Sequence, residues 1–451
     1  MLKVFRFSRS QAMGNFWSQK SIPLGALLWL TLASPLMAQS NPSQPSQFTL
    51  SLSEAFSKAN AQNPQLKAAE RNLDLSKGDI TIAGATPNPQ IQTQYGFGAA
   101  YSEAGNIQQA LLAQTVELGG KRDARINVAN AQYQVTNLQL NALRWDIHNQ
   151  VRRAYAELAA AEANAQLVDT QVALVDQLVQ ITRKRVEAGV APEAELLQAK
   201  LARTQLDAQQ AQAKGRIQNA RIQLNGLFGE PPEANTVVSD KGLFNLSVTK
   251  TELAPSPQST LPPVEAIVKQ AYAQRLDLKA NIQQQEVARS QLRLIDALRT
   301  PDLQLGLGYV FTTFTNANPQ TSGVLTTVGV TLPIFYNQNG EAAKAKATLE
   351  QTGLQIETSR RQIATNIHVA YQTLSVAREN IIKYQNRILS DAEEVQKLAQ
   401  ESYQVGKTGL ASVILAQQSV QQVRLGYLDA IVAYQGAWAD LESAVGVPLN
   451  L

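Results

Sequence analysis

Few residues in this 451-residue chain have the type and spacing that catalysis or metal binding requires. The segment Gly119-Gly120-Lys121-Arg122 is similar to a phosphate-binding loop, but that motif needs a glycine where Thr115 stands and a serine or threonine where Arg122 stands. The two histidines, His148 and His368, lie far apart, and neither belongs to a His-Glu-x-x-His pattern. We therefore predict a strand-to-helix turn at 119–122 and no metal site.

The composition excludes further classes of chemistry. Without cysteine, the chain cannot form disulfides, thiolate zinc sites, iron–sulfur clusters or cysteine nucleophiles. It has no Gly-x-Ser-x-Gly nucleophile motif. Its 40 basic and 36 acidic residues are interspersed and do not form a basic stripe. We therefore expect a protein that is not an enzyme, has no cofactor or metal, and does not bind nucleic acid.

The amino terminus has the layout of a secretory signal peptide. Four basic residues precede an apolar run over 22–36, and a polar stretch over 39–47 follows it. We expect cleavage after Ala38. The alternative, a membrane anchor, is disfavoured because the run is short and contains two prolines. Loss of this segment removes four basic and no acidic residues, so the remaining chain would carry 36 of each.

Two stretches lack helix breakers over unusual lengths. Neither glycine nor proline occurs in the 68 residues between Gly120 and Gly189, and Gly353 alone interrupts the 65 residues over 341–405. As one helix, the first stretch would span about 100 Å. Apolar residues recur every seven positions in parts of both stretches, but the pattern is not sustained. We therefore predict long helices packed against several neighbours, not a two-stranded coiled coil.

The two halves of the chain resemble each other. Residues 61–68 align with 273–280 at an offset of 212, and Gly189 aligns with Gly406 at an offset of 217. Because the offset between aligned residues changes so little along the half-chain, we infer an internal duplication. The predicted segments are a signal peptide (1–38), a polar segment (39–47), a first repeat (48–228), a linker or insert (229–263) and a second repeat (264–451).

Each half also contains two stretches in which apolar residues alternate with polar or small ones. Strands of this kind could form a membrane barrel with a wet interior, or a hairpin that caps a helical bundle in water. Because four strands cannot close a useful pore, several protomers would have to share one barrel. The predicted strands are 90–97, 107–118, 302–314 and 324–334, and they follow predicted helices over 51–82 and 264–300.

These features together resemble the TolC-like outer-membrane efflux proteins. The resemblance covers about 48–450 and rests on the duplication, on the order of the elements and on four short segments. The segments are Leu52-Ser-Glu-Ala55, Asn63-Pro64-Gln65-Leu66, Pro87-Asn88-Pro89 and Glu117-Leu-Gly-Gly-Lys-Arg122. The last of them is most similar to the branch of the family that serves heavy-metal exporters of the cobalt-zinc-cadmium type.

The resemblance implies a mainly α protein with a small β part. Three protomers would each give four strands to a shared twelve-stranded β-barrel in the outer membrane and long helices to a periplasmic α-barrel. The homotrimer would contact outer-membrane lipid and act as the passive duct of a tripartite efflux system. It would dock with a periplasmic membrane-fusion adaptor and an inner-membrane pump.

The resemblance also assigns roles to the two turns between long helices. Glu195 and Tyr403 would belong to an aperture that closes the duct, although Glu195 replaces the usual aspartate and Thr408 stands at the position of an arginine. Alternatively, the turn glycines only end one helix and start the next. The residues expected to contact the adaptor are Gly189, Val190, Ala191, Gly406, Lys407 and Thr408.

A soluble periplasmic coiled-coil scaffold or adaptor is the alternative function. Such a protein would lack barrel strands and would be recovered from the periplasm without detergent. The sequence does not identify the exported substrate.

Overall fold

The computed structural model describes residues 48–96, 106–239, 253–313 and 321–449. The predicted signal peptide and the polar segment after it lie outside these residues. The described residues from Phe48 onward belong to one compact unit.

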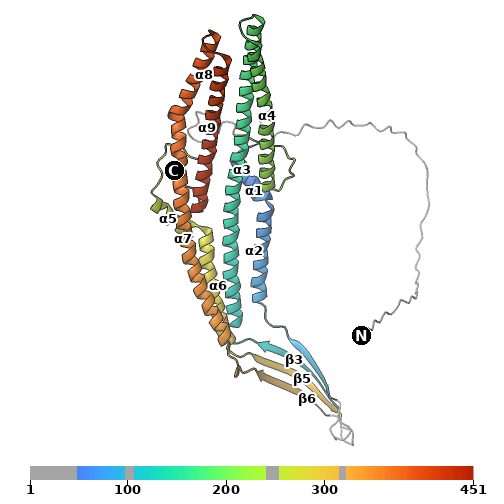
Figure 1. The fold of residues 1–451 in the computed structure, drawn as a ribbon. Coiled ribbons are helices and arrows are strands. Elements are labelled where there is room, and N and C mark those ends of the chain that lie inside the picture. Colours follow the sequence, from blue (N-terminus) through green and yellow to red (C-terminus); the bar gives the residue numbers. More distant parts are fainter. Residues whose placement is uncertain (1–47, 97–105, 240–252, 314–320, 450–451) are drawn as a thin grey trace, which may run out of the picture. The chain divides into compact units, whose positions relative to one another are not determined.

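Both halves have the same order of elements: two helices, two strands, a very long helical segment and a return helix (Figure 1). The first half comprises α1 (Leu52–Gln62), α2 (Pro64–Ala83), β2 (Gln90–Gly96), β3 (Asn106–Val116), α3 (Lys121–Glu187) and α4 (Glu193–Phe228). The second comprises α5 (Val264–Gln274), α6 (Leu276–Leu298), β5 (Leu303–Thr313), β6 (Thr321–Val330), α7 (Asn339–Lys383), the π-helical η1 (Tyr384–Ile388), α8 (Leu389–Gln404) and α9 (Leu410–Val445). Two short parallel strands, β1 (Phe48–Leu50) and β4 (Thr236–Val238), pair with each other.

The prediction of one unbroken helix over 51–82 was wrong. The Ser51 capping box starts α1 as expected, but the helix ends at Asn63. The Asn63 side chain accepts hydrogen bonds from the backbone N–H groups of Gln65 and Leu66, at 2.9 and 3.1 Å, and so caps a second helix. Pro64 favours this start because its missing N–H costs nothing in a first turn. The helix predicted over 264–300 is likewise divided, at Arg275.

The predicted long helices are confirmed. Helix α3 runs for 67 residues without interruption, and α7, η1 and α8 follow one another without a turn. The π-helical segment brings Tyr384 against α9, where a Cβ at Gly426 would lie only 2.5 Å from the Tyr384 hydroxyl. Long helices of this kind depend on packing against neighbours, not on intrinsic propensity.

The packing joins the two halves. Helix α3 contacts α4 in its own half and α6 and α9 in the other. One apolar core surrounds Tyr155 on α3 and another surrounds Trp438 on α9. Between these cores Arg152 forms an ion pair with the buried Glu442 carboxylate, which also accepts a hydrogen bond from the Leu449 N–H at 2.9 Å. Loss of either charged partner would leave the other buried and unpaired, which is costly.

The four long strands form one antiparallel sheet in the order β2-β3-β5-β6. Its central pair, β3 with β5, joins the first half to the second, and β2 and β6 form its edges. The register places Leu112 opposite both Ile91 and Leu307, so these side chains share one face. The predicted apolar face is therefore confirmed.

This apolar face is exposed, whereas the opposite face is partly covered. Tyr309, Val324 and Val328 all lie on the exposed face. Leu111, on the other face, packs over Gly306 and Gly308. The predicted strand 324–334 ends early, at Val330, so Leu332 and Ile334 lie beyond it.

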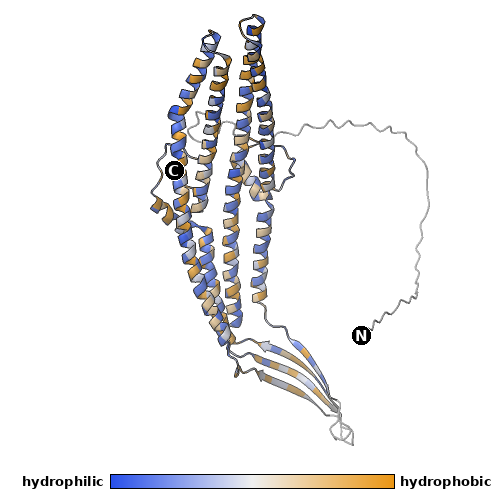
Figure 2. Cartoon of the chain, in the orientation of Figure 1, coloured by the Kyte–Doolittle hydropathy of each residue, from blue (hydrophilic) through white to orange (hydrophobic). Residues whose placement is uncertain are grey.

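Hydrophobic and hydrophilic residues are mixed along the long helices (Figure 2). Within the described ranges, we find no helix that combines the length and the apolar character needed to cross a membrane.

The close approach of β3 and β5 predicts different costs for two strand glycines. A Cβ at Gly308 would lie 2.4 Å from the Ala110 carbonyl oxygen, whereas one at Gly323 would meet nothing within 4 Å. We expect Gly308→Val to destabilise the protein by about 3 kcal/mol or to prevent folding, because backbone would have to move. Gly323→Val should fold normally. Thermal unfolding followed by circular dichroism measures both, and equal stability of the two variants would contradict this account of the sheet.

Candidate functional site

The two turns between long helices have the same backbone structure. Gly189 follows α3 with φ +70° and Gly406 follows α8 with φ +75°. In each turn the next residue donates its N–H back to a helix carbonyl: Val190 to Arg185 at 2.9 Å and Lys407 to Ser402 at 2.8 Å. This left-handed ending reverses the chain within a few residues.

The structure places most residues of the predicted adaptor contact on the surface of these turns. Gly189, Gly406 and Lys407 are exposed, and Val190 presents 65% of its surface to solvent. Ala191 and Thr408 are half-buried. An exposed valine at a helix tip is available for contact with another protein.

Tyr403 lies in a different environment, since it is only 2% exposed. It packs in an apolar core with Val175 and Leu178 of α3 and Leu206 of α4. The tip of the second half is therefore packed against the tip of the first half within one protomer.

Polar groups of the first half surround the Tyr403 ring. The Arg185 guanidinium lies 4.5 Å from the ring centroid and donates to the Tyr403 carbonyl oxygen at 2.9 Å. The Tyr403 hydroxyl lies 3.4 Å from both the Thr182 hydroxyl and the Glu195 carboxylate. The structure thus brings the two predicted aperture residues, Glu195 and Tyr403, within long hydrogen-bond distance.

Arg185 is a site residue that the sequence did not predict. The resemblance placed an arginine only at position 408, whereas Arg185 reaches Tyr403 from the other half of the chain. The available signal was its position one helical turn before Gly189, because a cation in a last turn also interacts favourably with the helix dipole.

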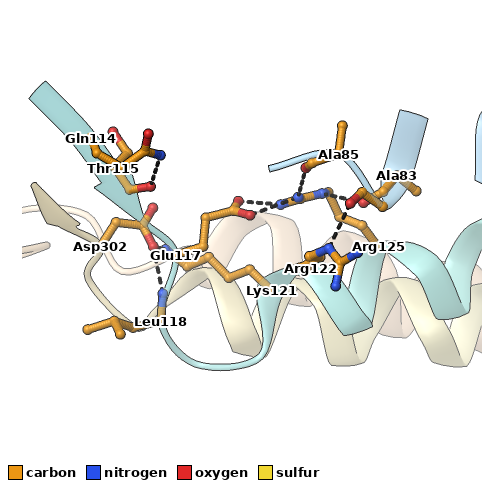
Figure 3. Close-up of polar contacts among 11 residues, drawn as sticks. Ala83, Ala85, Gln114, Thr115, Glu117, Leu118, Lys121, Arg122, Arg125 and Asp302 are labelled. Atoms are coloured by element: carbon orange, nitrogen blue, oxygen red, sulfur yellow. Dashed lines mark hydrogen bonds and ion pairs between the residues drawn. The ribbon is translucent and has the colours of Figure 1, made fainter. Parts of the chain in front are cut away.

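A second polar cluster lies where the sheet meets the helices (Figure 3). Lys121, at the start of α3, is buried and donates to the Asp302 carboxylate at 2.6 Å. The same carboxylate oxygen accepts from the Leu118 N–H at 3.2 Å. The two halves are therefore joined by a charge-assisted bond between residues 181 positions apart.

Two arginines extend this cluster to the end of α2. Arg125 pairs with Glu117, at 2.9 Å between Nη2 and Oε2, and donates to the carbonyl oxygens of Ala83 and Ala85. Arg122 donates to the Gly84 carbonyl oxygen at 2.7 Å. The hydrogen bond from Arg125 holds the pKa of Glu117 below the ordinary value of 4.5. The last turn of α2 is thus fixed to the start of α3.

The glycines of this segment form the predicted turn. Gly119 and Gly120 have φ of +73° and +69°. A Cβ at Gly119 would lie 2.6 Å from the Thr300 side chain, so no other residue fits there without movement. The interpretation of 119–122 as a strand-to-helix turn is confirmed.

The histidines lie in ordinary environments. His148 stacks on Phe56 at 4.8 Å and lies 2.9 Å from the Asn60 side-chain oxygen, and burial lowers the pKa of its imidazole. His368 is exposed on α7. Across the ranges that the structure describes, no three His, Cys, Asp or Glu side chains are grouped to hold a metal ion.

Comparison with known proteins identifies relatives over most of the chain. The sequence profile of outer membrane efflux proteins matches residues 55–230 and 267–447. The cobalt-zinc-cadmium resistance protein CzcC of Cupriavidus metallidurans is 27% identical over 390 residues, which are 86% of this chain and 88% of that protein. The outer membrane protein TolC of Vibrio cholerae is 22% identical over 408 residues, 88% of this chain and 90% of that protein.

Solved structures share the fold. The outer membrane protein VceC of Vibrio cholerae superposes with a TM-score of 0.67 at 18% identity, over 88% of this chain and 96% of that chain.

The Glu117–Arg125 pair predicts an acid-sensitive part of the stability. Because the pKa of Glu117 is lowered in the folded protein, the pair stabilises it above about pH 4.5, and this contribution disappears as the pH falls further. We expect Glu117→Gln to lose about 1–2 kcal/mol at pH 7 in chemical denaturation, and the difference from wild type to shrink towards pH 3.

Glu357→Gln is the matched control, because it removes an exposed pair with Arg361 and should cost almost nothing at either pH. A difference between wild type and Glu117→Gln that did not change with pH would contradict the role of this carboxylate.

Proposed function

Because this chain belongs to the outer membrane efflux protein family, we propose that three copies of it form a duct that exports divalent metal cations. Family members are outer-membrane channels of tripartite efflux systems. Membership therefore favours the channel over the soluble periplasmic scaffold. The trimer, the docking residues and the cargo are the parts that we propose.

The observation that carries the trimer is the incomplete sheet. Strands β2 and β6 each leave one edge unpaired, while the face containing Tyr309 and Val328 exposes apolar side chains. In a bilayer every backbone N–H and C=O group needs a partner within the protein. Pairing of the β6 edge with β2 of the next copy satisfies both edges. Three copies then close a ring of twelve strands, with the apolar face towards lipid and the Gln- and Gly-rich face towards water.

Exposed apolar side chains on the helices support the same assembly. They lie on α7, on α8 and at the C-cap of α8 in the second half, and on α2 and α4 in the first half. Large apolar groups at helical spacing are typical of surfaces that another helix covers. A second copy would bury both sets at once. The exposed residues are Val369, Val376, Val395, Leu398 and Val405 in the second half and Leu75, Ile82, Leu197 and Leu201 in the first.

The turns at the far end of the long helices are the proposed docking site for a periplasmic adaptor. Val190 and Lys407 are exposed there, and Gly189 and Gly406 fix the shape of the backbone. The Tyr403 core holds the two turns of one protomer together. An adaptor would thus meet paired turns, six per trimer, and through the adaptor the duct would join an inner-membrane pump.

The proposed cargo rests on the relative named for cobalt, zinc and cadmium resistance. Such cations are strongly hydrated and need a wet path, not a binding site. The glutamine, glycine and threonine residues on the face of the sheet opposite the apolar one suit that requirement. Energy and selectivity would then belong to the pump.

Thiol cross-linking tests the trimer. Thr93 on β2 and Thr326 on β6 lie at opposite edges of the sheet and on the same face. Within one protomer these strands are separated by three strand spacings, about 14 Å, so a shorter bifunctional thiol reagent cannot join them. We expect the double variant Thr93→Cys/Thr326→Cys to yield covalent dimers and trimers in membranes. Each single variant is a control and should stay monomeric, as should the double variant if no barrel is shared.

A complementation experiment tests both the proposed metal cargo and the proposed docking role of the turns. We expect a strain without this protein to lose tolerance to cobalt, zinc and cadmium. Gly189→Asn should restore it because asparagine adopts positive φ readily, whereas Gly189→Val should not. A steric clash would not explain the failure of Gly189→Val, since a Cβ at position 189 meets nothing within 4 Å.

Two further measurements distinguish a loss of docking from a loss of folding. They are the amount of each variant in the outer membrane and its co-purification with the adaptor. Full tolerance with Gly189→Val would refute the docking role. Unchanged tolerance in the deletion strain would refute the metal cargo.

A further inference from the structure

The two connections from the sheet to the long helices differ. Four residues, 117–120, link β3 to α3, and eight residues, 331–338, link β6 to α7. The first connection is fixed by the Lys121–Asp302 and Arg125–Glu117 ion pairs. No ion pair between described residues involves the second connection, although the two connections occupy equivalent places in the duplicated fold.

The second connection instead presents large apolar side chains to solvent. Leu332 is 62% exposed and Ile334 is 76% exposed, and Phe335 is fully exposed. Ile334 donates its N–H to the Leu332 carbonyl oxygen at 2.9 Å, which keeps the segment tightly turned. Three such groups side by side are not expected on a surface that faces only water.

The segment directly follows the apolar strand β6 in the chain. Val324, Val328 and Val330 lie on the apolar face of the sheet, and the same alternation in the sequence carries on beyond the strand to Leu332 and Ile334. These exposed apolar side chains thus follow directly, along the chain, those that meet lipid in the proposed duct.

Charge along the chain marks how far this apolar zone extends. No charged residue occurs over 303–340, between Asp302 and Glu341. In the first half, by contrast, Glu117 follows directly after β3. The residues that follow Phe335 are polar: the Tyr336 hydroxyl bonds to the Glu341 carboxylate, and Asn337 precedes the start of α7. This order, apolar, then amphipathic, then charged, is the order of depths at a bilayer surface.

We propose that Leu332, Ile334 and Phe335 form an interfacial anchor that inserts into the periplasmic leaflet of the outer membrane. This inference rests on the proposed function, because it requires the sheet to lie in the bilayer. Each trimer would carry three such anchors around the base of its barrel. They would fix the depth of the barrel in the membrane, while the ion pairs of the first connection fix the sheet to the helices.

Site-directed spin labelling tests the anchor, and the absence of cysteine makes single labels straightforward. Phe335→Cys carries the test label, Thr326→Cys on β6 is the membrane reference, and Val190→Cys at the helix tip is the water reference. The trimer is reconstituted into vesicles of phosphatidylethanolamine and phosphatidylglycerol. We expect the ratio of oxygen to nickel-chelate accessibility at position 335 to exceed that at position 190 several-fold and to approach that at position 326.

A ratio at position 335 equal to that at position 190 would overturn the anchor, as would low accessibility to both reagents, which would show that a neighbouring copy covers the segment. If position 326 remains membrane-like in either case, the proposed duct stands without the anchor. An aqueous ratio at position 326 would overturn both. Ile334→Cys repeats the measurement at an adjacent side chain and guards against disturbance by the label at Phe335.

Discussion

The unpaired edges of a four-stranded sheet are the constraint on which the proposed assembly depends. A bilayer supplies no hydrogen bonds to free backbone groups, so β2 and β6 must find partners before the sheet can lie in one. Additional copies of the chain supply these partners without any new element. The exposed apolar side chains on α2, α4, α7 and α8 are consistent with the same neighbours, because helices attached to a closed ring of strands are brought side by side.

Duplication explains how one chain contributes a continuous part of such a ring. The central strand pair, β3 with β5, joins the halves at the sheet, and the Arg152–Glu442 pair joins them between the two apolar cores. The Tyr403 core joins them again at the turns. Because contacts at the sheet, between the cores and at the turns all connect the halves, the protomer behaves as one unit although its sequence repeats.

The halves have also diverged where their surroundings differ. The first connection between sheet and helix uses buried ion pairs, and its Gly119 leaves no room for a side chain against Thr300. The second is longer, lacks charge and exposes Phe335. The charged groups of the first connection position the sheet against the helices. The lowered pKa of Glu117, for example, has a structural cause in its bond with Arg125.

The sequence by itself determined the features that depend on local spacing. Absence of glycine and proline predicted the 67-residue α3, and alternation predicted which face of the sheet is apolar. The break at Asn63 was missed because Asn-Pro was taken as part of a helix, when it caps one helix and starts another. Only the tertiary structure showed that Lys121 meets Asp302 and that Arg185 meets Tyr403. These partners lie more than 180 residues apart, so their contact depends on how two long helical hairpins pack, which no local pattern encodes.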